Sequence, residues 1–122
     1  MKKLEKIIPE GTRDLIFDDC RIKREIENKI RNIFINFGYN EIITPSLEFF
    51  DVFMLGDKSL SGDQMYKLID SKNRLLVLRP DNTLPIARVV STRLKDIDLP
   101  LRLFYNQNVF RTNEQQSGKK DE

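Results

Sequence analysis

The sequence predicts an α+β fold in which an antiparallel sheet is flanked by helices. Three features indicate this class: a long segment with apolar residues at helical spacing, a hairpin signature in the middle of the chain, and the lack of the glycine-rich strand-to-helix turn typical of parallel nucleotide-binding sheets. The 122 residues correspond to one domain at most, and 39% of them are hydrophobic, which is enough to form a core.

The first long element is a helix expected over Asp18–Phe37. Its apolar side chains recur at steps of three and four residues and form one stripe, made of Ile22, Ile26, Ile30, Ile33, Phe34 and Phe37. Caps and favourable charge at its start are expected from Asp14, Asp18 and Asp19, and Gly38 is suited to end it. A stripe so rich in Ile and Phe must be covered by the sheet of this domain or by a partner subunit.

A β-hairpin is expected in the middle of the chain. Two β-rich runs, Met65–Ile69 and Arg74–Leu78, flank the turn-forming residues Asp70–Asn73. The elements expected before the hairpin are an extended lead-in over residues 1–13, a short strand over 39–44 that ends at Pro45, a mixed segment over 47–53 that begins as a strand and continues irregularly, and a loop over 55–64.

A second helix is expected from Asn82 or Thr83 to Leu94. Asp81 or Asn82 can cap it, and Pro85 is tolerated in its first turn. The elements expected after it are a turn over 98–100, one strand over 101–105 and 108–111 with a polar interruption, and a loop over 112–122.

The composition excludes several kinds of site. The net charge is only +2, and the basic residues of the first helix are interrupted by Glu25 and Glu27, so a solvated helix face is a better interpretation than a nucleic-acid surface. The sequence has no histidine and one cysteine, Cys20, which rules out an internal disulfide and argues against a Cys/His zinc site. We expect no metal and no cofactor. The sequence also lacks a secretory signal and a membrane-spanning run, so a cytoplasmic protein is expected.

The candidate binding residues lie in the last third of the chain. The carboxylate of Asp81 and the hydroxyl of Thr83 could hold a ligand ammonium, although on local sequence alone a helix cap is the favoured interpretation of Asp81. Arg111 ends a strand, where a guanidinium can bind a phosphate or carboxylate, or can simply be exposed to solvent. Arg79 and Lys119 are further candidates for contact with an anion; for Arg79 an ion pair with an acid such as Asp81 remains open, and for Lys119 a plain surface loop.

Four segments, taken together and in order, resemble the core of the class II aminoacyl-tRNA synthetases, and within that class the histidyl branch. They are PEGTRD at Pro9–Asp14, FGYNEIITPSLE at Phe37–Glu48, LRPDNT at Leu78–Thr83 and NVFRTNEQQSGKKDE at Asn108–Glu122. The resemblance implies that the second segment and the helix before it form motif 1, through which subunits dimerise. It also implies that the acid and the threonine of the third segment hold the amino end of histidine, and that the arginine of motif 2 binds the carboxylate and α-phosphate region.

The sequence departs from a catalytic histidyl enzyme at three places. Asp81-Asn82 stands where that enzyme carries Glu-Gly, Asn113 stands where motif 2 has a Glu that helps to position ATP, and Glu114-Gln115 stands where it has Arg-Pro. These segments are more similar to a paralogue family, the regulatory subunits of ATP phosphoribosyltransferase. That resemblance implies a non-catalytic subunit that assembles with a short-form catalytic subunit. Together the two would carry out the first step of histidine biosynthesis under feedback by histidine.

We therefore expect residues 1–122 to be the N-terminal part of a class II synthetase-like core domain. By resemblance, a histidine-like ligand would contact Asp81, Thr83 and Arg111, no residue would be catalytic, and the dimer interface would include Ile22, Ile26, Ile30 and Pro45. Two alternatives stay open at this point. One is a fragment of an active histidyl-tRNA synthetase, and the other is an interaction module that pairs through the Ile-rich helix.

Overall fold

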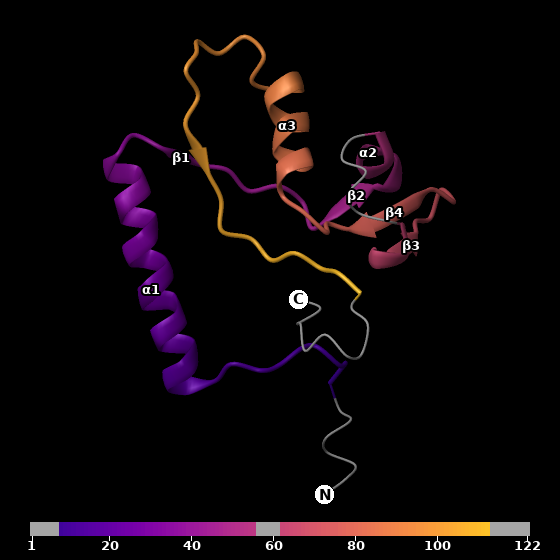
Figure 1. Ribbon diagram of the computed structural model, residues 1–122, viewed down its shortest axis with the longest axis horizontal. Coiled ribbons are helices and arrows are strands. Elements are labelled where there is room, and N and C mark those ends of the chain that lie inside the picture. Colours follow the sequence, from indigo (N-terminus) through magenta and orange to yellow (C-terminus); the bar gives the residue numbers. More distant parts are fainter. Residues whose placement is uncertain (1–7, 56–61, 113–122) are drawn as a thin grey trace, which may run out of the picture.

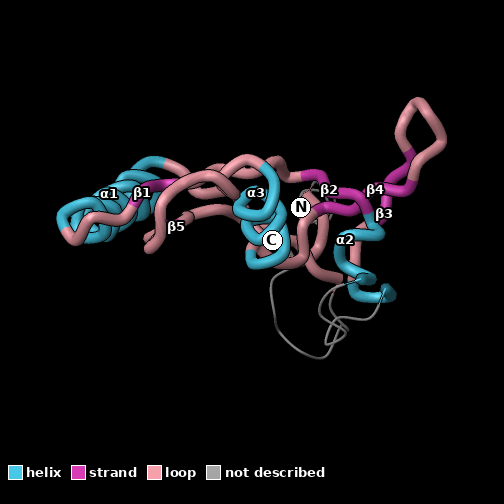
Figure 2. The backbone as a smooth tube through the Cα atoms, turned by 90° about the horizontal axis from the view of Figure 1, so that it is seen from above, coloured by secondary structure: helices cyan, strands magenta, loops and turns pink. Residues whose placement is uncertain are grey.

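The computed structural model describes residues 8–55 and 62–112, and their elements are spread along one elongated layer (Figure 1). Helix α1 (Phe17–Asn36) lies at one end, a small sheet lies at the other, and helix α3 (Thr83–Thr92) lies between them. The view from above in Figure 2 shows how shallow this layer is. No helix in the described ranges is long and apolar enough to cross a membrane.

The strands form two separate sheets. Strands β2 (Leu47–Phe49), β4 (Leu75–Leu78) and β3 (Lys67–Ile69) make an antiparallel sheet in the order β2-β4-β3. Strand β1 (Asn40–Glu41) pairs in parallel with β5 (Leu103–Phe104), a pairing between segments about sixty residues apart that the sequence did not predict. The α+β class with a small antiparallel sheet is confirmed.

Helix α1 has the predicted extent but not the predicted cap. The residue before it is Ile16, and no side chain caps its first turn, so the expected capping by aspartate was wrong. Asp18 and Asp19 still lie in the first turn, where negative charge is favourable. At the other end, Gly38 has a φ of 83°. The amides of Gly38 and Tyr39 donate to carbonyls of the last turn, which is the Schellman arrangement that favours glycine.

The hairpin of β3 and β4 is confirmed, and a carboxylate holds its turn. Lys67 lies opposite Val77 and Ile69 opposite Leu75. The backbone amide of Arg74 donates to Asp70 Oδ1 at 2.8 Å, and the guanidinium of Arg74 donates to Oδ2 at 2.8 Å. Hydrogen bonds from Arg74 are the main reason that the pKa of the Asp70 carboxyl is lowered from its ordinary value.

The core lies between the sheet and helix α2 (Phe50–Leu55). Phe53, Met65 and Val77 are buried there, with Leu84 of α3 packed against them. The segment over 47–53 begins as the predicted strand. It then continues as α2 rather than irregularly, because a helical turn is what brings Phe53 over Val77 of the sheet. A 3₁₀ turn, η2 (Gly62–Gln64), precedes β3.

The predicted last strand is shorter than expected. Only Leu103–Phe104 pairs as a strand, and residues 105–112 continue without regular structure. This stretch is held by other bonds: the amide of Phe110 donates to the carbonyl of Arg79 at 3.0 Å, and the amide of Thr112 donates to the carbonyl of Gln64 at 3.0 Å. The segment therefore passes the start of α3 on its way to the three-stranded sheet (Figure 1).

Candidate functional site

The start of α3 carries the predicted acid and threonine. Asn82 occupies the N-cap position but makes no side-chain capping bond. Instead, Asp81 Oδ1 accepts the backbone amide of Thr83 at 2.8 Å and so satisfies one of the free donors at the helix start. The capping interpretation of Asp81 is therefore confirmed. A carboxylate in this position lies where the positive end of the helix dipole favours negative charge.

The structure brings the predicted arginine to the same place. Arg111 Nε donates to the carbonyl of Pro80 at 2.8 Å, and Pro80 directly precedes Asp81. Residues about thirty positions apart in the chain thus meet at the start of α3. The Asp81 carboxylate, together with a guanidinium that is bound to the carbonyl of the preceding residue, can bind a molecule that carries an ammonium and a carboxylate.

A largely buried polar cluster lies next to the start of α3. Its members are Thr44, Arg79, Asn82 and Gln107, and we name it the Arg79 cluster after its central residue. Arg79 is only 6% exposed, and its guanidinium donates to the carbonyl of Asn108 at 2.5 Å and to the carbonyl of Thr44 at 2.9 Å. Burial lowers the pKa of the Arg79 guanidinium from its ordinary value. The described partners of this side chain are mainly carbonyl oxygens, and its contact with a ligand anion stays a prediction.

Sequence reasoning missed the other members of this cluster. Thr44 and Asn82 are each 4% exposed, and the side-chain amide of Gln107 joins them. Polar residues at such separations carry no periodic pattern. The only sequence signal was the polar interruption between Tyr105 and Asn108 in an otherwise apolar strand.

The remaining predicted residues lie elsewhere. Lys119 is outside the described residues. The proposed interface residues are on the surface: Ile22, Ile26 and Ile30 are about half exposed, and Pro45 is exposed in the connection after β1. Ile30 also lines a hollow of about 120 Å³ between α1 and the end of β5.

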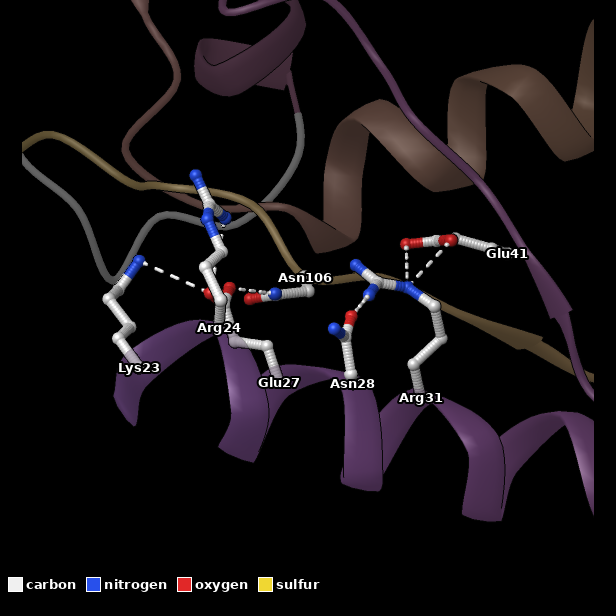
Figure 3. Close-up of polar contacts among 7 residues, drawn as sticks. All are labelled: Lys23, Arg24, Glu27, Asn28, Arg31, Glu41 and Asn106. Atoms are coloured by element: carbon white, nitrogen blue, oxygen red, sulfur yellow. Dashed lines mark hydrogen bonds and ion pairs between the residues drawn. The ribbon is translucent and has the colours of Figure 1, made fainter. Parts of the chain in front are cut away.

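A second polar group ties α1 to the paired strands β1 and β5 (Figure 3). The side-chain amide of Asn106 donates to the carboxylate of Glu27, which also lies 3.2 Å from Arg24. One turn after Glu27, Arg31 pairs with Glu41 of β1 at 3.1 Å. The hydrogen bond from Asn106 is the main reason that the pKa of the Glu27 carboxyl is lowered.

We expect the contact between Glu27 and Asn106 to weaken in acid. Because the folded pKa of Glu27 lies below the ordinary value of 4.5, its contribution is fully present above that value and is lost as pH falls through the folded pKa. Glu27→Gln should lower the free energy of unfolding near neutral pH by about 1 kcal/mol or less, since the pair is near solvent. Urea unfolding from about pH 7 to about pH 3 should show the difference from wild type shrinking; a constant difference would contradict the role of the charge.

Comparison with known proteins identifies the family. The family model described as histidyl-tRNA synthetase matches residues 11–122, which is nearly the whole chain. The chain belongs to the histidyl-tRNA synthetase family. Within this family, curated relatives named ATP phosphoribosyltransferase regulatory subunit match the chain throughout. The protein of Clostridium acetobutylicum is 50% identical over 119 residues, which cover 98% of this chain and 29% of the relative.

A second such relative, from Clostridium kluyveri, is 48% identical over 122 residues, which cover 100% of this chain and 31% of the relative. The chain thus spans under a third of the length of the curated relatives it matches. The resemblance to the synthetase family and to the regulatory-subunit family, predicted from four motifs, is confirmed.

Solved structures of the histidyl-tRNA synthetase family share the fold. The structure described as an ATP phosphoribosyltransferase regulatory subunit/histidyl-tRNA synthetase from Bacillus halodurans superposes with a TM-score of 0.81 at 38% identity, covering 95% of this chain and 30% of that one. The apo histidyl-tRNA synthetase of S. aureus gives a TM-score of 0.73 at 31% identity, covering 85% of this chain and 29% of that one. The described elements are therefore those of a class II synthetase-like core.

Proposed function

We propose that this chain is the N-terminal part of the synthetase-like core of an ATP phosphoribosyltransferase regulatory subunit. The subunit would be non-catalytic and cytoplasmic. It would assemble with a short-form catalytic subunit, and would be required for activity and for feedback by histidine in the first step of histidine biosynthesis. The observation that carries the proposal is the identity of 48–50% over 98–100% of this chain to relatives of that name.

The residues at the candidate site support a role without aminoacylation. Asn113 stands in place of the motif 2 Glu that, by resemblance, helps to position ATP in the synthetase. Asp81, Thr83 and Arg111 keep the residue types that would hold an amino acid. We propose that Asp81 and Thr83 bind the ammonium of histidine and that Arg111 binds its carboxylate. Lys119 and Arg79 are proposed as further contacts for an anion.

Reconstitution tests the proposed function. The full-length protein is mixed with a short-form ATP phosphoribosyltransferase catalytic subunit from the same source, and formation of phosphoribosyl-ATP is followed with and without histidine. We expect activation by the protein and reversal of that activation by histidine. The absence of any activation would contradict the regulatory assignment.

Substitution of Asp81 tests the proposed ligand contact. Asp81→Asn keeps an oxygen that can accept the amide of Thr83 but removes the charge, whereas Asp81→Ala removes both. We expect both variants to weaken histidine binding about tenfold or more in isothermal titration, because a charge-assisted hydrogen bond contributes about 1.5–3 kcal/mol. Only Asp81→Ala should also lower thermal stability, because the helix start loses its acceptor.

The control for this pair is Asp96→Ala, which removes an exposed carboxylate beyond the end of α3. It should leave both histidine affinity and stability unchanged. Wild-type histidine affinity in Asp81→Asn would show that this carboxylate only caps the helix.

A second candidate function is that of a catalytic histidyl-tRNA synthetase. The family description and the S. aureus neighbour favour it. The two functions differ in one assay, because a synthetase alone catalyses histidine-dependent exchange between ATP and pyrophosphate. Exchange by the full-length protein, together with no activation of the catalytic subunit, would establish the synthetase and would mean that Asn113 does not prevent adenylation.

A further inference from the structure

We infer that Gln107 is a positioning residue, which sets the place of Asp81 by holding the start of α3 onto the connection after β1. The inference adds a residue that the resemblance does not assign. Only the test that measures histidine affinity rests on the proposed histidine site. The effect of Gln107 on the start of α3 can be measured without ligand.

The side-chain amide of Gln107 is fully engaged. Its Oε1 accepts the backbone amide of Thr44 at 2.7 Å, and the guanidinium of Arg79 approaches the same oxygen at 3.5 Å. Its Nε2 donates to Thr44 Oγ1 at 3.1 Å and to Asn82 Oδ1 at 2.8 Å. A backbone amide can only donate, so the contact with Thr44 fixes which end of the Gln107 amide is the oxygen.

This arrangement explains why Asn82 does not cap α3 with its own side chain. Asn82 occupies the N-cap position, where its oxygen would ordinarily accept an amide of the first turn. That oxygen is instead bound to Gln107, and Asp81 accepts the amide of Thr83. The two side chains therefore have different roles. Asp81 caps the helix, and Asn82 anchors the helix start to the segment that contains Gln107.

The segment after β5 holds the chain on both sides of Asp81. Gln107 binds Asn82 directly after Asp81, and Arg111 binds the carbonyl of Pro80 directly before it. The amide of Phe110, which lies between Gln107 and Arg111 in the chain, donates to the carbonyl of Arg79. Asp81 is thus fixed between two anchored neighbours, and the same segment presents Arg111. A shift of the Gln107 contact would move the proposed ammonium site relative to the proposed carboxylate site.

The contacts of Gln107 also connect this region to the segment that follows helix α1. Thr44 follows β1 by three residues, and β1 follows the end of α1. Thr44 and Asn82 are each 4% exposed, so solvent does not replace the bonds from Gln107 if they are lost. Gln107 therefore joins the connection after α1 and β1 to the start of α3.

The primary test is hydrogen exchange on the full-length protein without ligand. Gln107→Met keeps the length of the side chain and removes all of its hydrogen bonds. We expect faster exchange at the amides of the first turn of α3, with no change in the middle of α1. Gln64→Met is the matched control, because Gln64 is an exposed glutamine in η2. Unchanged exchange at the start of α3 in Gln107→Met would overturn the inference.

The second test uses histidine. Gln107→Met should raise the dissociation constant for histidine about fivefold to tenfold, whereas activation of the catalytic subunit without histidine should change less than about twofold. A purely structural loss would weaken histidine binding and activation together. If the wild-type protein binds no histidine, the proposed ligand fails, and hydrogen exchange alone decides the role of Gln107.

A double-mutant cycle connects the effect to Asn82. If Gln107 acts through this side chain, Gln107→Met should have little further effect on exchange at the start of α3 once Asn82→Ala is present, whereas it should add fully to Gln64→Met. Asn82→Ala alone should also speed exchange there, which keeps the test decisive if Gln107→Met fails to fold. Full additivity of Gln107→Met and Asn82→Ala would overturn the proposed route.

Discussion

Replacing Arg79 with methionine is expected to lower the free energy of unfolding of the full-length protein by about 2–4 kcal/mol. Methionine fills similar space but cannot donate, so the carbonyls of Thr44 and Asn108 lose their donors, and Thr44 is only 4% exposed, so water does not easily take the place of the lost bond there. These carbonyls belong to segments that no strand pairing joins at this point. The loss should therefore separate the segment after β5 from the connection after β1.

Urea unfolding measures this effect. Arg102→Met is the matched control, because Arg102 is exposed beside β5, and its side chain should contribute well under 1 kcal/mol. Arg79→Lys should restore little, since one ammonium cannot reproduce a planar guanidinium that contacts two carbonyls. Equal stability of the Arg79→Met and Arg102→Met proteins would mean that the Arg79 cluster contributes nothing to folding.

Placing a charge in the apolar stripe of α1 is expected to dissociate a dimer formed through this helix, which the resemblance to motif 1 implies and which we propose here. Ile26 is 53% exposed in the single chain, and Ile22 and Ile33 beside it are similarly exposed. If two subunits cover this stripe, Ile26→Asp buries an unpaired carboxylate, and the dissociation constant should rise about a hundredfold or more. Sedimentation of the full-length protein at micromolar concentration should then show monomers.

Asn32→Asp provides the control for this prediction. It introduces the same charge on the same helix, but at 100° per residue it lies on a different side from Ile26. It should leave the dimer intact. A soluble Ile26→Asp protein that remains fully dimeric would show that this face is not the interface, and Ile30→Asp, nearer the hollow beside β5, then tests the adjacent part of α1.

Local patterns were enough for the elements whose causes are local. The stripe of α1 and its glycine stop, the hairpin with its Asp70 turn and the start of α3 at Thr83 were all predicted from neighbouring residues. Each is formed by contacts within a few positions, such as the hydrogen bonds of Asp70 to residues 72 and 74. The helix α2 was missed because its formation depends on burying Phe53 against Val77 of the sheet, which lies 24 positions away in the sequence.

The residues of the candidate site also fall into those that could be predicted from the sequence and those that could not. Asp81, Thr83 and Arg111 could be chosen from the sequence because their charges and their places at element ends are visible in it. Neither Thr44 nor Gln107 could be chosen, because a lone threonine or glutamine is ordinary on a surface and acquires a role only when a distant partner is buried with it.

The sequence by itself determined which segments form α1, α3 and the hairpin, which residues are candidates for binding an amino acid, and the resemblance to the histidyl-tRNA synthetase family. Only the tertiary structure decided that the segment over 107–112 lies along Arg79–Asn82, that β5 pairs in parallel with β1, and that Asp81 caps α3 while Asn82 anchors it. The physical reason is the range of the interactions. Helix and turn propensities act between neighbours in the chain, whereas a buried hydrogen bond forms wherever folding removes two polar groups from water together.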